Sequence, residues 1–249
     1  MIILKTDREI GIMREANRII AVILNEIGDR IAPGACTLDL DTWAEKRLGE
    51  MNARPAFKGY RNYPATLCTS INCEVVHGIP TKERILREGD IVGIDIGSIY
   101  GGYYGDGAWT FAVGQISDEA SALMETCRTA LDVGIAEAKE GNCVGDISRA
   151  IDRSVRSRHF EIVRDLSGHG IGRNLHEEPV VLNYDDGRHG QRLKRNMTLA
   201  IEPMITAGTY QVKTLADRWT VVTADGSLSA HYEHTVAITA NGPEILTRI

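Results

Sequence analysis

The apolar positions in the first fifty residues recur at intervals of three and four, which is the period of an α-helix with one buried face. The segment Thr6–Glu9 has the sequence of a capping box, and the apolar period that follows it continues to Gly28. A second periodic segment begins after the Ala32–Gly34 break and stops before Pro55. The pattern therefore predicts two amphipathic helices at the start of the chain.

β-Branched and aromatic residues bounded by glycines predict short strands in two stretches of the chain. The first holds strands at about 66–72, 91–96 and 103–113, and the second at about 197–207, 220–223 and 229–240. Between them the helical period returns at about 117–139 and 147–159. This repeated order predicts an internal duplication with halves of about 1–115 and 116–249. No Pro/Ser-rich linker separates the halves, so we expect one α+β domain over residues 1–249.

Two aspartates, Asp95 and Asp106, flank a Gly101–Gly102 turn signal. If a hairpin folds between Tyr100 and Gly101, the two carboxylates lie directly opposite each other, with Cβ atoms ~5 Å apart. Like charges at that distance repel, so the pair predicts a positive partner, for which one or two metal ions are the simplest candidates. Turn-flanking aspartates that pair with arginines are the alternative.

Three further residues could complete a metal site: Glu202, Glu233 and His169. Glu202 interrupts an apolar run, where a carboxylate is costly to bury without a partner, and Glu233 has a comparable place in the last predicted strand. Glycines around His169 permit close approach of a ligand. Four carboxylates and one imidazole suit Mn, Fe, Co or Zn, and are enough to hold two ions ~3.5–4 Å apart. Taken singly, each residue has a structural alternative, such as an ion pair or a hydrogen-bonded loop.

Two more histidines, His77 and His176, are each followed within three residues by proline. This context predicts strand ends or loop edges, where catalytic groups are commonly mounted. A hydrogen-bonded turn histidine is the alternative for both. The remaining histidines have weaker contexts and are assigned no catalytic role; they are His159, His189, His231 and His234.

The composition limits the possible partners and the compartment. The chain has 28 Lys+Arg against 34 Asp+Glu, which argues against a nucleic-acid substrate because phosphate contacts need clustered cations. Its five cysteines include no Cys-x-x-Cys pair, so neither a disulfide framework nor a zinc knuckle is expected. No signal-peptide core or membrane-spanning run is present. We therefore expect a soluble protein of the reducing cytoplasm.

Seven segments, taken in order and spacing, resemble the type I methionine aminopeptidases. They cover nearly the whole chain and are Val75–Pro80, Gly93–Gly97, Gly105–Asp106, Gly168–Gly172, His176–Pro179, Ile201–Met204 and Tyr232–Thr235. The resemblance implies a pseudo-two-fold "pita-bread" fold, in which a curved, mainly antiparallel sheet is covered by two pairs of helices. It also implies two divalent ions (Co, Mn, Fe or Zn) on five ligands, which match Asp95, Asp106, His169, Glu202 and Glu233.

The same resemblance implies removal of the N-terminal methionine from nascent proteins and peptides when the second residue is small. Glu202 would carry a proton as well as bind metal, and His77 and His176 would contact the scissile amide. The residues that match the methionine pocket are Tyr60, Tyr63, Cys68 and Trp219. A monomer that acts on nascent chains, and possible docking to the ribosome, belong to the same set of expectations.

Four residues depart from the usual pattern of bacterial relatives, and they put the pocket's shape in question rather than the reaction. They are Phe57, Trp109, Leu175 and Asn196. A proline-specific pita-bread peptidase and an inactive binding protein with the same fold are the alternatives. All five ligand positions and both histidine positions are filled, which disfavours the inactive protein, and the early position of His77 disfavours the proline-specific enzyme.

Overall fold

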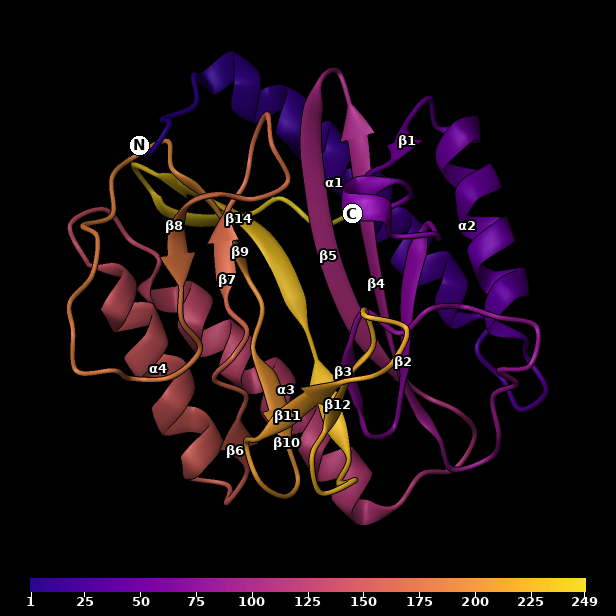
Figure 1. Cartoon of the computed structure of the whole chain (residues 1–249). Helices are drawn as coiled ribbons and strands as arrows, with labels where there is room; N and C mark the ends of the chain where they lie inside the picture. Colours follow the sequence, from indigo (N-terminus) through magenta and orange to yellow (C-terminus); the bar gives the residue numbers. More distant parts are fainter.

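Two pairs of helices flank a long curved sheet in the computed structural model, which describes residues 1–249 (Figure 1). The helices are α1 (Asp7–Gly28), α2 (Thr37–Glu50), α3 (Asp118–Glu137) and α4 (Val144–Arg156), with one short 3-10 turn, η1 (Tyr60–Asn62). All four predicted helices are confirmed. Thr6 caps α1 with the predicted capping box, and Ser117 caps α3 through a hydrogen bond to the Ala120 amide. None of these helices combines the length and hydropathy that a bilayer crossing requires.

The first half of the chain contributes β1 (Arg54–Pro55), β2 (Leu67–Ile71), β3 (Glu74–Val76), β4 (Ile91–Tyr100) and β5 (Tyr103–Ala112). The second half contributes β6 (Glu161–Ile162), β7 (Gly168–Gly170), β8 (Glu177–Val181), β9 (Thr198–Ile201), β10 (Met204–Thr206), β11 (Val212–Thr214), β12 (Val221–Thr223), β13 (Ser229–His231), β14 (Glu233–Thr239) and β15 (Gly242–Ile245). The main sheet has the order β1-β4-β5-β14-β9-β7-β8, with β2 beside β4 and β15 beside β14, and every pairing is antiparallel.

Each pair of helices builds its own hydrophobic core with the nearest strands. One core joins α1 and α2 to β2 and β4 through residues such as Leu24, Leu48 and Ile94. The other joins α3 and α4 to β9 and β14 through residues such as Leu123 and Leu199. The sheet crosses from one core to the other only at the pairing of β5 with β14. Residues on these two strands therefore lie at the junction between the cores.

The β4–β5 hairpin has a different register from the predicted one. Its turn consists of Gly101 and Gly102, both with positive φ, so Tyr100 pairs with Tyr103. Asp95 consequently lies opposite Ala108, and Asp106 lies opposite Gly97. The prediction that the two aspartates face each other directly is wrong by two residues. Because side chains alternate along a strand, a shift of two leaves both carboxylates on the same face of the sheet, at diagonal positions.

Two predicted strands are each divided in two. The run at 197–207 breaks at Glu202 and Pro203, because proline has no amide hydrogen for the ladder. The run at 229–240 breaks at Tyr232, and its two parts join different sheets. The breaks place Glu202 just after β9 and make Glu233 the first residue of β14. Both acids therefore lie at strand ends, where a side chain can turn into a cavity.

A fully buried asparagine ties α1 to the strand that carries Asp106. Asn17 lies on the apolar face of α1, donates to the Met13 carbonyl (2.9 Å) and accepts from the Asp106 amide (3.2 Å). Asp106 pairs with Gly97 across the hairpin, and the Asp106 amide donates to the Asn17 side chain. A polar residue among the apolar positions of the helix thus satisfies a backbone group beside a candidate ligand.

We expect Asn17→Ala to lower the free energy of unfolding by about 1–3 kcal/mol, because it leaves the buried Asp106 amide without an acceptor. Urea unfolding followed by circular dichroism measures the change. The control is Asn25→Ala on an exposed position of the same helix, which should stay within about 0.5 kcal/mol of the parent. Equal effects of the two substitutions would contradict the role given to Asn17.

Candidate metal centre

The sheet register collects four carboxylates at the junction of the two cores. Ala108 on β5 pairs with Asp95 on β4 on one side and with Glu233 on β14 on the other. Directly paired residues share a face, so Asp95 and Glu233 lie on the same side of the sheet, and Asp106, two residues before Ala108, joins them. Glu202 follows β9, the next strand beyond β14.

His169 brings a nitrogen donor to this group of acids. It lies on β7 beside β9, and its Nδ1 is 2.9 Å from the Gly170 carbonyl oxygen. A carbonyl only accepts, so Nδ1 carries the hydrogen and Nε2 presents its lone pair. That Nε2 is 3.4 Å from Glu202 Oε1 and 3.8 Å from Asp106 Oδ2. Two ligands that each lie ~2.1 Å from one ion are about 3–4 Å apart, so these spacings suit donors that share a metal.

Two overlapping sets of donors meet at Glu233. Asp106, His169 and Glu233 form one set, and Glu202, His231 and Glu233 form the other, with the ligand atoms of each set within 4.8 Å of one another. Asp95 belongs to neither set but lines the same cavity. Buried oxygens of Asp95, Asp106 and Glu233 have no hydrogen-bond partner. Unsatisfied buried oxygens of this kind are costly unless a cation binds them.

The electrostatics of the acids also favour a cation. Removal from solvent raises the pKa of Asp95 to about 7. Burial, followed by the charge of Asp95, raises the pKa of Asp106 and of Glu202 well above their ordinary values. Burial and the charge of Asp106 do the same for the pKa of Glu233. Arg61 is the only Lys or Arg that lines the cavity, so divalent ions are the partners that would keep these groups ionised.

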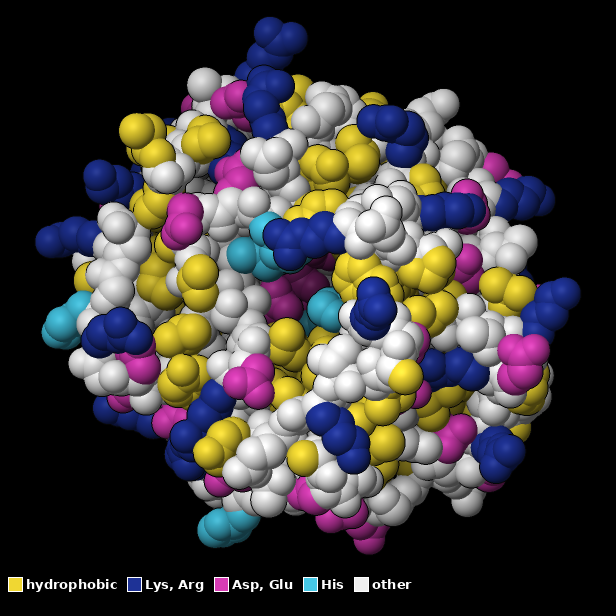
Figure 2. Space-filling view, in the orientation of Figure 1, with side chains coloured by type: hydrophobic (Ala, Val, Ile, Leu, Met, Phe, Trp, Pro, Cys, Tyr) yellow, Lys and Arg dark blue, Asp and Glu magenta, His cyan; other side chains and the backbone are white.

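All the site residues expected from the sequence line this one cavity; they are Tyr60, Tyr63, Cys68, His77, Asp95, Asp106, His169, His176, Glu202, Trp219 and Glu233. Figure 2 shows the opening as a hollow near the middle of one face, with acidic side chains in its depth and histidines beside them. Side chains from both halves of the chain therefore meet around one opening.

The two remaining predicted histidines lie on separate loops, His77 just after β3 and His176 just before β8. His176 lies at the rim, where its Nδ1 is 2.8 Å from the Tyr60 hydroxyl and its ring stacks on the Tyr60 ring at 5.5 Å. Burial, followed by the charge of Arg61, lowers the pKa of His176. Burial and His176 lower the pKa of His77 to about 4. Both imidazoles are therefore neutral near pH 7, where each carries one N–H that can donate to a substrate.

An apolar wall adjoins the acids. Buried Tyr63 meets Trp219 edge to face at 5.0 Å, and the Tyr63 hydroxyl donates to the Leu67 carbonyl. Cys68 on β2 pairs with Asp95, and burial together with that carboxylate raises the pKa of its thiol, which stays neutral. Among the departures noted above, Phe57 and Leu175 line the cavity. The cavity thus combines an acidic floor with an aromatic and sulfur-containing side.

The other two departures lie away from the cavity. Trp109 packs beside Phe111 against the core of α1 and α2. Asn196 has a φ of 68°, a region that glycine and asparagine tolerate best, and its side chain donates to the Lys5 carbonyl at 2.6 Å. Neither residue touches the candidate ligands.

Sequence reasoning missed one member of the site. His231, to which no role was assigned, is buried in the cavity wall with its Nε2 3.8 Å from Glu202 Oε2 and no hydrogen-bond partner for that nitrogen. The Thr110 hydroxyl donates to the His231 carbonyl and accepts from the His231 amide. Its position two residues before Glu233 was the available signal, but the break at Tyr232 hid the direction of its side chain.

A family model described as metallopeptidase family M24 matches residues 11–240. The chain belongs to metallopeptidase family M24. As a member it is a metal-dependent hydrolase, and the donor set described above is the part of the fold that fits the metal. The deductions from the sequence about family and enzyme class are confirmed.

Among individual proteins, the chain is similar over its full length to methionine aminopeptidases. A methionine aminopeptidase from Clostridium acetobutylicum is 52% identical over 247 residues, which are 99% of this chain and 99% of that protein. The crystal structure of methionine aminopeptidase from Thermotoga maritima matches with a TM-score of 0.98 and 44% identity over 100% of both chains. A prolidase from Pyrococcus furiosus gives a TM-score of 0.77 at 25% identity, over 99% of this chain and 66% of the prolidase. These matches confirm the pita-bread fold.

We expect Ala108→Val to weaken metal binding by this M24 protein about 10-fold or more, because the added methyl groups enter the space between Asp95 and Glu233. Calorimetric titration of the metal-free protein with Mn²⁺ measures the affinity. Ala112→Val, at the exposed end of β5, is the matched control and should bind as the parent does. Unchanged affinity in the folded Ala108 variant would show that this position is not part of the metal site.

Proposed function

We propose that this M24 protein removes the N-terminal methionine from peptides and nascent proteins when the second residue is small. The observation that carries the proposal is the combination, in one cavity, of five oxygen and nitrogen donors with an apolar, sulfur-containing wall. The family membership supports a metal-dependent hydrolase, and the full-length similarity to methionine aminopeptidases supports this substrate rather than a proline-containing one.

Two divalent ions are held by Asp95, Asp106, His169, Glu202 and Glu233 in this proposal. Glu233 belongs to both donor sets, and Asp106 lies on the strand between those of Asp95 and Glu233, so both carboxylates would be within reach of either ion. Bound there, the ions supply a water molecule made nucleophilic near neutral pH and a Lewis acid for the peptide carbonyl. Co, Mn, Fe and Zn all suit such a donor set, which is dominated by carboxylates with few nitrogens.

The chain's own residues position the substrate and move the proton. Glu202 carries a proton to the leaving amine as well as binding metal, and its position beside His169 in the cavity wall supports both tasks. His77 and His176 donate N–H hydrogen bonds to the scissile amide from opposite sides, where they stabilise the negative charge that develops on the carbonyl oxygen. Their lowered pKa values support neutral donors at pH 7.

The methionine side chain lies against Tyr60, Tyr63, Cys68 and Trp219. A thioether makes favourable contacts with aromatic edges, and the T-shaped Tyr63–Trp219 pair offers such edges. A neutral Cys68 thiol adds a polarizable surface without charge. Because the acidic floor lies directly beside this wall, the free α-amino group of the first residue falls near the metals, which limits release to one residue.

The whole chain serves as one catalytic domain in the proposal, since Asp95 and Asp106 come from the first half and His169, Glu202 and Glu233 from the second. A monomer is sufficient because one chain supplies every site residue. The five free cysteines suit the reducing cytoplasm, where nascent chains are found. Nascent chains could be met at the ribosome or after release.

The activity is tested with metal-free protein incubated with Mn²⁺ or Co²⁺ and with Met-Ala-Ser, Leu-Ala-Ser or Ala-Pro peptides. We expect release of free methionine from Met-Ala-Ser only, and only after metal is added. Amino-acid analysis of the products measures it. Cleavage of the proline peptide instead would favour a proline-specific enzyme, and no release with any divalent ion would contradict the proposal.

We expect Glu202→Gln to fold and to lose turnover by about 100-fold or more, because the amide keeps the shape but cannot carry the proton. Methionine release at saturating peptide measures kcat, and circular dichroism confirms the fold. Glu125→Gln, on an exposed position of α3, is the control and should leave kcat unchanged. Normal turnover in the Glu202 variant would refute the role assigned to this residue.

A further inference from the structure

His77 is held in the cavity in a different way from His176. The His176 ring has the Tyr60 hydroxyl as partner, whereas the His77 ring makes no hydrogen bond with the chain and stands T-shaped to the Trp219 ring, at 6.0 Å between centroids. The backbone of His77 has a φ of 60°, in the left-handed region that a residue with a Cβ rarely adopts. The direction of this ring therefore depends on whatever holds the strained backbone.

The backbone around His77 is pressed against β2. A Cβ on Gly78 would lie 2.2 Å from the Thr69 carbonyl oxygen, so only glycine fits there. The Gly78 carbonyl accepts from the Thr69 amide (2.7 Å), and the Gly78 amide donates to the Ser70 hydroxyl (3.3 Å). The loop can keep this close approach only if β2 and the residues after Gly78 stay in register with each other.

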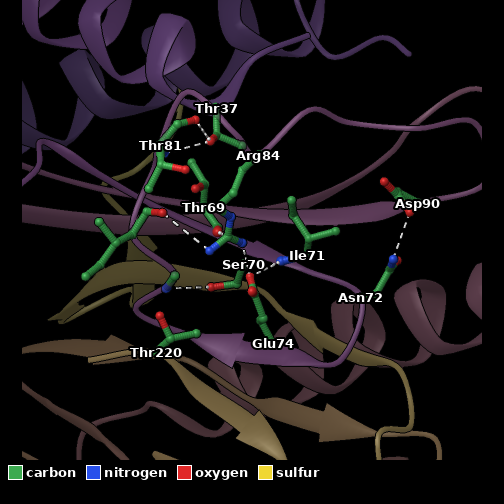
Figure 3. Close-up of polar contacts among 12 residues, drawn as sticks. Thr37, Thr69, Ser70, Ile71, Asn72, Glu74, Thr81, Arg84, Asp90 and Thr220 are labelled. Carbon is green, nitrogen blue, oxygen red and sulfur yellow. Dashed lines mark hydrogen bonds and ion pairs between the residues drawn. The ribbon is translucent and has the colours of Figure 1, made fainter. Parts of the chain in front are cut away.

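One guanidinium spans both sides of this contact (Figure 3). Arg84 donates from Nη2 to the Thr69 carbonyl (3.0 Å) and from Nη1 to the Ile79 carbonyl (3.3 Å), and it forms an ion pair with Glu74. Glu74 in turn accepts from the Ile71 amide at 2.7 Å. Both side chains of the pair are mostly buried, at 21% and 16% exposure. The pair therefore connects β2, the first residue of β3 and the segment after His77.

We propose that Arg84 is a positioning residue that sets the direction of the His77 ring. The inference rests on the proposed function of His77 as a donor to the scissile amide. The planar guanidinium can serve two carbonyls and a carboxylate at once, which a lysine ammonium on a flexible stem does less well. Displacement of a catalytic group by ~1 Å can cost about 100-fold in rate, so loss of this support should be visible in turnover.

The test is a double-mutant cycle with Arg84→Ala and His77→Ala, measured as kcat and KM for Met-Ala-Ser with saturating Mn²⁺. We expect His77→Ala to lower kcat by at least about 10-fold, and Arg84→Ala to lower kcat by a similar factor with KM within about 2-fold. In the His77→Ala background, Arg84→Ala should change kcat by less than about 2-fold, because the residue through which it acts is already gone. Arg84→Lys should recover part of the loss.

Arg87→Ala is the matched control, since Arg87 lies three residues further along the same segment with an exposed side chain, and it should leave kcat and KM unchanged. Should Arg84→Ala fail to fold, Glu74→Gln takes its place in the same cycle. Equal losses of kcat in both backgrounds, or no loss, would overturn the positioning role of Arg84. Full activity of His77→Ala would instead refute the proposed role of His77 itself.

Discussion

Mutual repulsion among four buried carboxylates at the junction of the two cores is the constraint around which this structure is organised. Asp95, Asp106, Glu202 and Glu233 are brought together by strand pairing, and removal from solvent raises the pKa of each. Neutral acids would satisfy the electrostatics but would be poor ligands. A divalent cation balances the negative charges while the acids stay ionised. The repulsion that the fold imposes on these acids therefore favours metal binding.

Residues around the candidate ligands orient the ligand atoms toward the cavity. Asn17 reaches from α1 to the Asp106 amide, and the Gly170 carbonyl fixes which nitrogen of His169 carries the hydrogen. These contacts lie outside the group of ligands, yet they determine which atoms point inward. Supporting contacts of this kind commonly matter as much to a metal site as its ligands do. The ion pair between Glu74 and Arg84 has the same kind of supporting role for His77 in the positioning that we propose.

The residues that form this site could be predicted from the sequence more completely than their geometry could. The face shared by Asp95 and Asp106 was predicted correctly although the register was wrong, because an error of two residues preserves the side of the sheet. The strand breaks at Pro203 and Tyr232 were missed, since an apolar run reveals composition but not where a ladder is interrupted. For the same reason His231 was not expected in the cavity. The positive φ of His77 depends on contacts with β2, which no local pattern records.

The junction of β5 with β14 has a further consequence. These strands are paired only through Glu233 with Ala108 and His234 with Gly107, a short connection between two substantial cores. The proposed ligand set includes residues from both sides of that connection, so metal bound there would act as a cross-link between the cores. A ligand that binds only the folded state stabilises it in proportion to the logarithm of its concentration. Metal bound at this site would therefore stabilise the folded chain in addition to its part in catalysis.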